Sequence, residues 1–347
     1  MKKLIIIALL MPFILLAKDY RDNREVKHFI NKLVKEYRYS KKSLNTLFAN
    51  VKVQKVPLRA FTHKDKIKRT PKQIARLKRL YPKYGAWNRY IKHKITPRRI
   101  NQGVSFLNKH KNILKIAQNM YGVPMEYIVA IIGIESVYGK NVGKYNVFDT
   151  LATLSFEPNR RNKFFKNQFL KFMHLAKKER FNPRDVYGSY AGAIGLGQFM
   201  PSNYEAYGVD FNRDGRITLQ QPADAIASIA NYLKKNGWRR GERVATRVKY
   251  KGNRFKGYKT GYRKRYNPST LKGIVLRELW GYRGKVSLIK LNRKSYDELW
   301  FGAKNFFVIT RYNHSAYYAM AVHQLAQKIK AKSLHKKKKS ISSLYEN

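Results

Sequence analysis

The chain of 347 residues contains no cysteine. This excludes a disulfide framework, thiol chemistry and a lipid attached through a cysteine of this sequence. Acidic residues are scarce as well, because 20 Asp and Glu stand against 74 Lys and Arg, for a formal net charge of +54. The excess is spread along the whole sequence. We therefore expect a polyanionic partner, either nucleic acid or an anionic lipid or cell-wall surface, unless a lysine-rich source proteome accounts for the charge.

No hydrophobic run is long enough to cross a bilayer comfortably, and the apolar run nearest the N-terminus has another interpretation. Lys2 and Lys3 precede thirteen apolar residues, 4–16, and the small residue Ala17 follows them. Residues 1–17 are therefore predicted to be a secretory signal peptide. Leu15 is larger than a cleavage site prefers, so an uncleaved membrane anchor remains the alternative. Export predicts a periplasmic protein whose partners belong to the envelope, with no nucleic acid among them. The residues do not specify the oligomeric state, and a monomer is expected.

Composition and apolar spacing predict a mainly α fold. Hydrophobic residues at 44% and aromatic residues at 14% exclude a disordered chain and favour two or three domains. The period of the apolar residues predicts helices over 26–37, 44–48, 96–117 and 318–329. The proline-containing basic stretch 51–94 predicts loops and short helices. From 241 to 308, short runs rich in Val, Tyr and Lys between glycines predict a small β-rich segment.

The residue with the clearest chemical signature is Glu135. An apolar run from Ile128 reaches this single carboxylate, and Gly139 offers a helix stop shortly after it. Burial and the negative end of the helix dipole both disfavour a charged carboxylate there, so the pKa of Glu135 should be raised. This pattern is typical of a proton donor that is neutral near pH 7. The alternative is a structural Glu paired with a Lys or Arg.

A glycine-rich segment, Gly188 to Pro201, is the second candidate site. It has four glycines and two alanines in fourteen positions, which lets another group approach the backbone. A tightly packed turn would explain the glycines but not Ser189 and Gln198, which are neutral hydrogen-bonding residues within it. These two side chains would suit a neutral ligand rich in hydroxyls and amides, such as a glycan.

Five blocks in this order make the chain similar to the membrane-bound lytic murein transglycosylase B family. They are Ile131–Glu135, Leu151–Phe156, Arg160-Arg161, Gly188–Pro201 and Ile309–Ser315. The resemblance implies a lysozyme-like α core with a helical N-terminal domain and a small inserted β-rich domain. The expected ranges are 18–100 for the N-terminal domain, 101–240 for the core, 241–308 for the β-rich domain, 309–333 for a helix returning to the core, and 334–347 for a basic tail.

The resemblance also implies a reaction on peptidoglycan. In this family one Glu acts as general acid and then as base, and Glu135 matches it. The reaction cleaves the β-1,4 bond between N-acetylmuramic acid (MurNAc) and N-acetylglucosamine (GlcNAc), and the C6 hydroxyl of the muramic residue closes a 1,6-anhydro ring. Ordinary glycosidases use two carboxylates, and no second acidic residue lies in the Glu135 block or in the glycine-rich segment. No organic cofactor is expected.

Further binding residues follow from matching the family motifs. Ser189 and Gln198 resemble hydrogen-bond partners of the substrate. Arg160 and Arg161 resemble contacts to lactyl or peptide carboxylates, for which the guanidinium fork is well suited. Tyr232, Tyr312, Asn313 and Tyr318 resemble residues of sugar subsites, although a Tyr at helical spacing is more often part of a core.

A separate motif predicts a calcium site. Asp210, Asn212, Asp214 and the Arg216 carbonyl fit positions 1, 3, 5 and 7 of an EF-hand loop. Gln221 replaces the bidentate Glu of position 12, and Asp224 is the better residue to complete the shell, as the family resemblance also suggests. We expect weak, structural Ca²⁺ binding, with a solvated Asx-rich turn as the alternative.

Two other functions remain open on the residues alone. In the first, water attacks at the same site, which would make the protein a muramidase with a second carboxylate near Glu135. In the second, the protein is a non-catalytic envelope protein that binds polyanions or cell wall through its basic surface.

Overall fold

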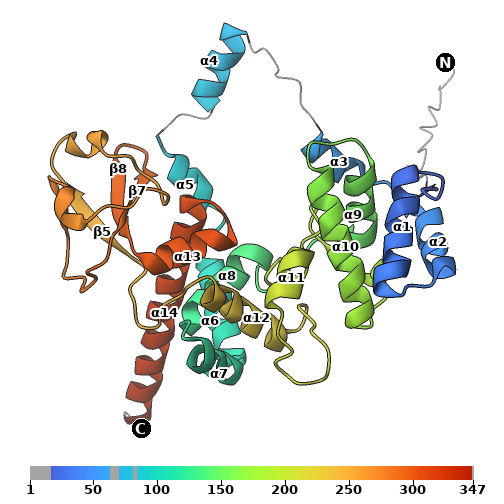
Figure 1. Ribbon diagram of the computed structural model, residues 1–347. Helices are drawn as coiled ribbons and strands as arrows, with labels where there is room; N and C mark the ends of the chain where they lie inside the picture. The colour runs from blue at the N-terminus through green and yellow to red at the C-terminus, as the bar shows by residue number, and fades with distance from the viewer. Residues whose placement is uncertain (1–16, 63–69, 81–83, 346–347) are drawn as a thin grey trace, which may run out of the picture. The chain divides into compact units, whose positions relative to one another are not determined.

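The computed structural model describes residues 17–62, 70–80 and 84–345. Most of the predicted signal peptide, residues 1–16, therefore lies outside the described residues. Within the described part of the chain, no helix is both long and apolar enough to span a bilayer. The chain divides into two compact units: the first comprises residues 1–63 and 144–193, and the second comprises 64–143 and 194–347. Both are mainly helical, as predicted (Figure 1).

The first unit is built around packed phenylalanines. Its helices are α1 (Arg24–Tyr37), α2 (Lys41–Ala49), α3 (Lys55–Phe61), α9 (Val147–Phe156) and α10 (Asn162–Lys178), with one 3-10 turn, η1 (Pro183–Asp185). The side chain of Asn23 caps α1, and that of Ser40 caps α2. Phe29 stacks on Phe169 at 4.9 Å between ring centroids, and Phe48 packs against both. The two amphipathic helices predicted at the N-terminus are thus confirmed as α1 and α2.

Two short strand pairs complete the first unit. The antiparallel pairs are β1 (Ala17–Lys18) with β2 (Val51–Lys52), and β3 (Tyr145–Asn146) with β4 (Tyr187–Gly188). The second pair joins the start of α9 to the glycine-rich segment, so the first half of that segment belongs to this unit.

The second unit surrounds one central helix. Its helices are α4 (Pro71–Leu80), α5 (Ala86–Ile91), α6 (Pro97–Lys109), α7 (Lys111–Tyr121), α8 (Met125–Ser136), α11 (Pro201–Tyr207), α12 (Pro222–Lys235), α13 (Lys304–Tyr312) and α14 (Ala316–Tyr345). Helix α8 contacts α6, α7, α12 and α14 (Figure 1). Because neighbours cover it on all these sides, its residues are apolar almost all round.

A four-stranded antiparallel sheet also belongs to the second unit. The strands are β5 (Ala245–Tyr250), β6 (Ile274–Leu276), β7 (Ser287–Asn292) and β8 (Asp297–Gly302), in the order β6-β5-β8-β7, with 3-10 turns η2 (Arg254–Gly257) and η3 (Pro268–Thr270). Its own core includes Val248, Leu288, Phe301 and Trp280. The β-rich character predicted for 241–308 is confirmed.

One predicted helix differs from what the structure shows. The helix predicted over 96–117 is divided into α6 and α7, because His110 leaves the helical conformation with φ −111° and ψ 25°. Apolar spacing continues across this break and could not reveal it. The expected core range, 101–240, contributes to both compact units, whose boundaries follow contacts instead of chain order. The domain ranges expected from the sequence remain a prediction.

Candidate active site

Helix α8 carries the predicted acid at its last turn. Ten of its twelve residues are buried, whereas Glu135 is partly exposed. The carboxyl thus lies near the C-terminal end of a buried helix, where a ligand can reach it. Such a position combines the desolvation that favours a neutral acid with the access that proton transfer needs.

The helix ends earlier than the sequence suggested. Gly139 was the expected stop, but α8 ends at Ser136, because Val137 and Tyr138 adopt left-handed backbone conformations with φ of 53° and 59°. This conformation is a genuine outlier for a β-branched residue and persists only when the surroundings hold it. The Tyr138 hydroxyl holds it here by donating to the Arg99 carbonyl at 3.0 Å.

Two glycines make room for the Tyr138 side chain. A Cβ atom on Gly103 of α6 would lie 2.6 Å from the Tyr138 hydroxyl oxygen, and one on Gly133 of α8 would lie 2.5 Å from it. Any side chain larger than hydrogen would therefore collide with the ring. These glycines let α6 and α8 enclose Tyr138, which fixes the turn immediately after Glu135.

The surroundings of Glu135 set its protonation state. Burial raises its pKa from the ordinary 4.5 to about 7, while a hydrogen bond from Tyr318 and the positive charge of Lys94 both oppose the rise. The Tyr318 hydroxyl donates to Oε1 of Glu135 at 2.6 Å. No acidic side chain of the described residues contributes to the shift. The raised pKa predicted for Glu135 thus agrees with its surroundings in the structure.

Aromatic side chains line one side of the carboxyl. Tyr318 is buried, and its ring is nearly parallel to that of Tyr312, with 6.4 Å between centroids and 8° between planes. Tyr312 is partly exposed and donates to the Gly197 carbonyl at 2.5 Å. Tyr232 is buried behind it, 4.8 Å from the Tyr312 ring, and its hydroxyl donates to the Arg311 carbonyl. Tyr232 therefore supports Tyr312 from within the core.

Gln198 and Asn313 also belong to the second unit. The Gln198 amide donates to the carbonyls of Val142, at 2.9 Å, and Gly195, at 3.0 Å. Its backbone is left-handed, with φ 51°. The side chain therefore ties the glycine-rich segment to the chain that follows α8. Asn313 is exposed directly after α13, next to Tyr312.

Three predicted binding residues belong to the first unit. The hydroxyl of Ser189 accepts from the amides of Ala191 and Ala193, at 3.3 and 3.0 Å, so it organises its own turn. Arg160 and Arg161 are exposed before α10, and the Arg161 guanidinium lies 4.0 Å from the Phe164 ring centroid. The structure thus groups Glu135, Gln198, Tyr232, Tyr312, Asn313 and Tyr318 in one unit, and Ser189, Arg160 and Arg161 in the other.

Two carboxylates of the first unit, Asp149 and Glu157, have structural partners. Asp149 pairs with Arg184 at 2.5 Å and also accepts from the amide of Lys52. Glu157 accepts from the Lys18 ammonium at 2.7 Å and from the Tyr20 hydroxyl at 2.6 Å. These carboxylates hold the unit together.

The EF-hand-like loop is folded around its acidic side chains. Asp210 accepts from the amides of Asp214 and Gly215, at 3.2 and 3.0 Å. Asp224 is fully buried, and its two oxygens accept from the amides of Phe211 and Thr218, at 2.9 and 2.7 Å. Among the described residues, no group of three or more His, Asp or Glu side chains is arranged to hold a metal ion. The carboxylates and the Asn212 amide nevertheless form the oxygen donor set that a hard cation prefers.

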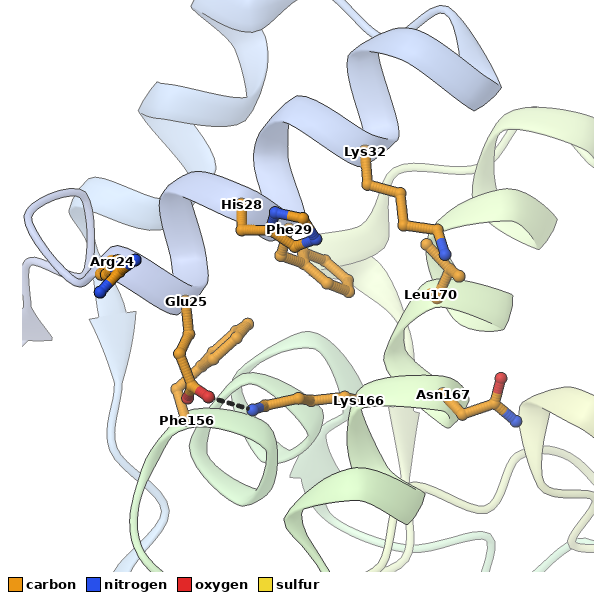
Figure 2. Close-up of a pocket in the computed structure, with 9 residues that line it drawn as sticks. All are labelled: Arg24, Glu25, His28, Phe29, Lys32, Phe156, Lys166, Asn167 and Leu170. Atoms are coloured by element: carbon orange, nitrogen blue, oxygen red, sulfur yellow. Dashed lines mark hydrogen bonds and ion pairs between the residues drawn. The ribbon is translucent and has the colours of Figure 1, made fainter.

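A large hollow lies near the surface of each unit. One, of about 610 Å³, lies in the first unit between α1 and α10, and the ion pair of Glu25 with Lys166 spans it (Figure 2). It contains none of the predicted site residues. The other, of about 1100 Å³, lies in the second unit along α6 and the turn after α8, and its lining includes Tyr138 and Val142. That hollow adjoins the turn that Gln198 holds.

Sequence reasoning missed two neighbours of Glu135. Lys94 is near enough to lower the pKa of the carboxyl, and Glu135 in turn helps burial to raise the pKa of Tyr90 to about 12. Both residues lie in the basic stretch read as loops and short helices, where no spacing marked them. The rings of Tyr90 and Trp87 pack against Tyr317 of α14, at 5.5 and 5.2 Å between centroids, and these contacts hold that segment near the site.

Together these features define a class of protein. A single carboxyl with a pKa near 7, on a buried helix and beside stacked tyrosines, is the arrangement of a general acid in an enzyme that cleaves glycosidic bonds. Comparison with known proteins identifies the enzyme. The transglycosylase SLT domain family matches residues 21–327. The chain is 38% identical to membrane-bound lytic murein transglycosylase B of Escherichia coli K12, over 90% of this chain and 84% of the relative.

Solved structures agree with this relationship. The Escherichia coli lytic transglycosylase SLT35, solved with bulgecin A and also with calcium, matches with a TM-score of 0.81 and 37% identity, over 92% of this chain and 96% of that one. SltB3 of Pseudomonas aeruginosa, in complex with NAG-anhNAM-pentapeptide, matches with a TM-score of 0.74 and 28% identity, over 88% and 79%. The chain belongs to the transglycosylase SLT family and is a lytic murein transglycosylase.

Proposed function

We propose that Glu135 serves as both general acid and general base in cleaving the bond between MurNAc and GlcNAc, with a 1,6-anhydro sugar as the product. One observation carries this proposal: Glu135 is partly exposed at the end of a buried helix, accepts a hydrogen bond from Tyr318 at 2.6 Å, and has a pKa that burial raises to about 7. A hydrolase that activates water would need a second carboxylate within about 5 to 9.5 Å. The relative SltB3 was crystallised with an anhydro-muropeptide, which supports the same product here.

The reaction needs one proton to move twice. Neutral Glu135 donates its proton to the glycosidic oxygen as the C1–O bond breaks, and the N-acetyl carbonyl of the substrate stabilises the positive charge at C1. The carboxylate then removes the proton of the C6 hydroxyl while that oxygen bonds to C1. Tyr318 assists the second half, because its hydrogen bond stabilises the carboxylate form of Glu135. Glu135 ends protonated, as it began.

The other second-unit residues would bind the sugars. Tyr312 offers a partly exposed ring beside Tyr318, and Asn313 offers an amide to hydroxyl or N-acetyl groups. Gln198 positions the glycine-rich backbone through its two donated hydrogen bonds and leaves its carbonyl oxygen for the substrate. Tyr232 acts indirectly, by supporting Tyr312.

The first-unit residues would serve other parts of the substrate. Arg160 and Arg161 are exposed guanidinium groups suited to the lactyl or peptide carboxylates. The Ser189 hydroxyl accepts two amides from its own turn and keeps its proton to donate to a glycan oxygen.

The decisive experiment is digestion of purified peptidoglycan by the chain from Lys18 onward and by its Glu135→Gln variant. We expect released muropeptides one water lighter than hydrolysis products, and loss of about 10² to 10⁴-fold in turnover for the variant, with substrate binding retained. Hydrated reducing ends would show a muramidase. Absence of any release would leave a protein that binds the wall without cleaving it.

We further propose that the loop 210–224 binds Ca²⁺ weakly and structurally. Asp210, Asn212, Asp214 and the Arg216 carbonyl would supply oxygens, and Asp224 would complete the shell. Support comes from this donor set and from the calcium complex of the relative SLT35. Calorimetry with Ca²⁺ should detect binding on the order of 10⁻⁴ to 10⁻³ M, which Asp214→Asn should weaken. No heat at millimolar Ca²⁺ would identify the loop as a plain Asx-rich turn.

For its location, the relationship supports the cell envelope, since the Escherichia coli relative is described as membrane-bound. We propose export to the periplasm through residues 1–17, with peptidoglycan strands as the main partner. The chain itself offers no cysteine for a lipid. Mass spectrometry of the mature protein would show whether the leader is removed or retained as an anchor.

A further inference from the structure

The free edge of the four-stranded sheet ends in an exposed apolar tip, which we define as residues 275–279. Among the described residues, edge strand β6 pairs with β5 alone, and all five residues of the tip are exposed. Three of them are large aliphatic residues: Val275 is 57% exposed, Leu276 42% and Leu279 100%. We propose that this tip inserts into the surface of an anionic lipid bilayer.

The sheet holds the tip away from its own core. Ile274, immediately before the tip, and Trp280, immediately after it, are both buried in the sheet's hydrophobic cluster. The chain is therefore anchored on both sides, and the residues between the anchors cannot turn inward without displacing them. Leu279, fully exposed and held in this way, therefore has apolar surface that is available to a binding partner.

Unpaired positive charge surrounds the apolar side chains. Residues 245–302 contain sixteen Lys and Arg but only three acidic residues. Two of those three, Asp297 and Glu298, are already paired with basic side chains of the same sheet. In the described part of the chain, the exposed cations near the tip form no ion pair; they are Lys249, Lys272, Arg277 and Arg283. Glu278 is the exposed acid among them.

Exposed aliphatic side chains surrounded by unpaired cations fit an anionic bilayer surface better than they fit a polyanionic polymer. Glycan strands and nucleic acids would satisfy the cations but offer little to an isolated leucine at the tip. A bilayer surface offers both phosphate groups and acyl chains within the same 5 to 10 Å, roughly, of depth. Each Lys or Arg near an anionic leaflet strengthens attachment about fivefold. The inference does not depend on the reaction at Glu135, because the tip contains none of the proposed site residues.

The test is co-sedimentation of the chain from Lys18 onward, which excludes the apolar leader, with lipid vesicles. We expect binding to vesicles of phosphatidylglycerol mixed with phosphatidylcholine, little binding to phosphatidylcholine alone, and weakening by salt. Leu279→Asp should reduce the affinity by about tenfold or more. Glu278→Lys should increase it, because it removes the one exposed acid of the tip. Both variants should digest soluble peptidoglycan fragments at the rate of the parent.

A matched control is available on α7 of the same unit. Ile116 and Met120 are 53% and 58% exposed, so Ile116→Ser with Met120→Ser removes comparable apolar surface elsewhere. This variant should bind vesicles as the parent does. Equal binding by Leu279→Asp and the parent, or an equal loss in the control, would overturn the proposal. So would a dimer in solution that Leu279→Asp abolishes, because it would assign the tip to a second copy of the chain.

Discussion

At the scale of single residues, the neutral form of Glu135 connects function with stability. Its pKa of about 7 lies above the value of 4.5 in an unfolded chain, so the folded protein retains a proton that the unfolded chain loses between these two values. Stability therefore falls as the pH rises through this window and becomes level above it. Poising the acid for catalysis thus costs stability at neutral and alkaline pH.

Glu135→Gln should remove that cost. At pH 8 we expect the variant to be more stable than the parent by on the order of 2 kcal/mol, and at pH 4 the two should be equal. Urea unfolding at both values measures the difference. Asp22→Asn, which alters a carboxylate that is 98% exposed, is the control and should show no such gain. An equal stability of Glu135→Gln and the parent at both pH values would contradict the raised pKa.

Tyr318 provides a second test at this scale. Its hydrogen bond to Glu135 stabilises the carboxylate and lowers the pKa, so Tyr318→Phe should move the alkaline limb of kcat/KM to higher pH. Loss of a bond to a charged group should also reduce kcat by about 10 to 100-fold. A full pH–rate profile measures both effects. Tyr187→Phe, at an exposed tyrosine, should change neither, and a lower rate with an unmoved limb would mean that Tyr318 is only structural.

The sequence revealed the acid but not its partners, for a physical reason. Glu135 stands out because it interrupts an apolar run, and burial of that run alone raises the pKa. Tyr318 and Lys94 act through tertiary contacts across 183 and 41 positions of the chain. No local periodicity encodes such contacts, and only motif resemblance had drawn attention to Tyr318.

At the scale of elements, the packing of α6 and α8 around the Tyr138 side chain depends on two glycines, Gly103 and Gly133. Gly133→Ala would place a Cβ within 2.6 Å of two atoms of the Tyr138 side chain, so we expect destabilisation of about 1 to 3 kcal/mol. Activity should fall with it, because Tyr138 fixes the turn after Glu135. Gly257→Ala is the control, since nothing lies within 4 Å of its added Cβ. Urea midpoints and turnover measure both, and a Gly133→Ala variant as stable as the control would contradict the close packing.

Helices were predicted where one apolar face meets a core and a cap is visible. The segment that begins at Thr96 and Pro97 has both features. Helix α6 begins at Pro97, and the Thr96 hydroxyl accepts from the Arg99 amide. The break at His110 and the left-handed residues after Ser136 escaped prediction. Neither proline nor glycine occurs at those points, and the conformations depend on partners elsewhere, such as the Arg99 carbonyl.

At the scale of the whole molecule, chain order and compact units do not coincide. Residues 144–193 leave the second unit after the turn that follows α8 and complete the first unit. The glycine-rich segment is consequently divided at Ala193, so that Ser189 and Gln198 belong to different units although nine positions separate them. The sequence alone predicted one site for this segment, because its division between the units is visible only in long-range contacts.

The net charge of +54 leads to a prediction for the molecule as a whole. Salt screens exposed charges beyond about 8 Å at physiological ionic strength, whereas the bond between Tyr318 and Glu135 is short and shielded by protein. Raising the salt concentration should therefore increase KM for insoluble peptidoglycan, whose stem peptides carry carboxylates, and leave kcat nearly constant. With a short soluble muropeptide, KM should change much less. Digestion of both substrates over a salt series measures the difference, and equal salt dependence would mean that the charge does not serve retention on the wall.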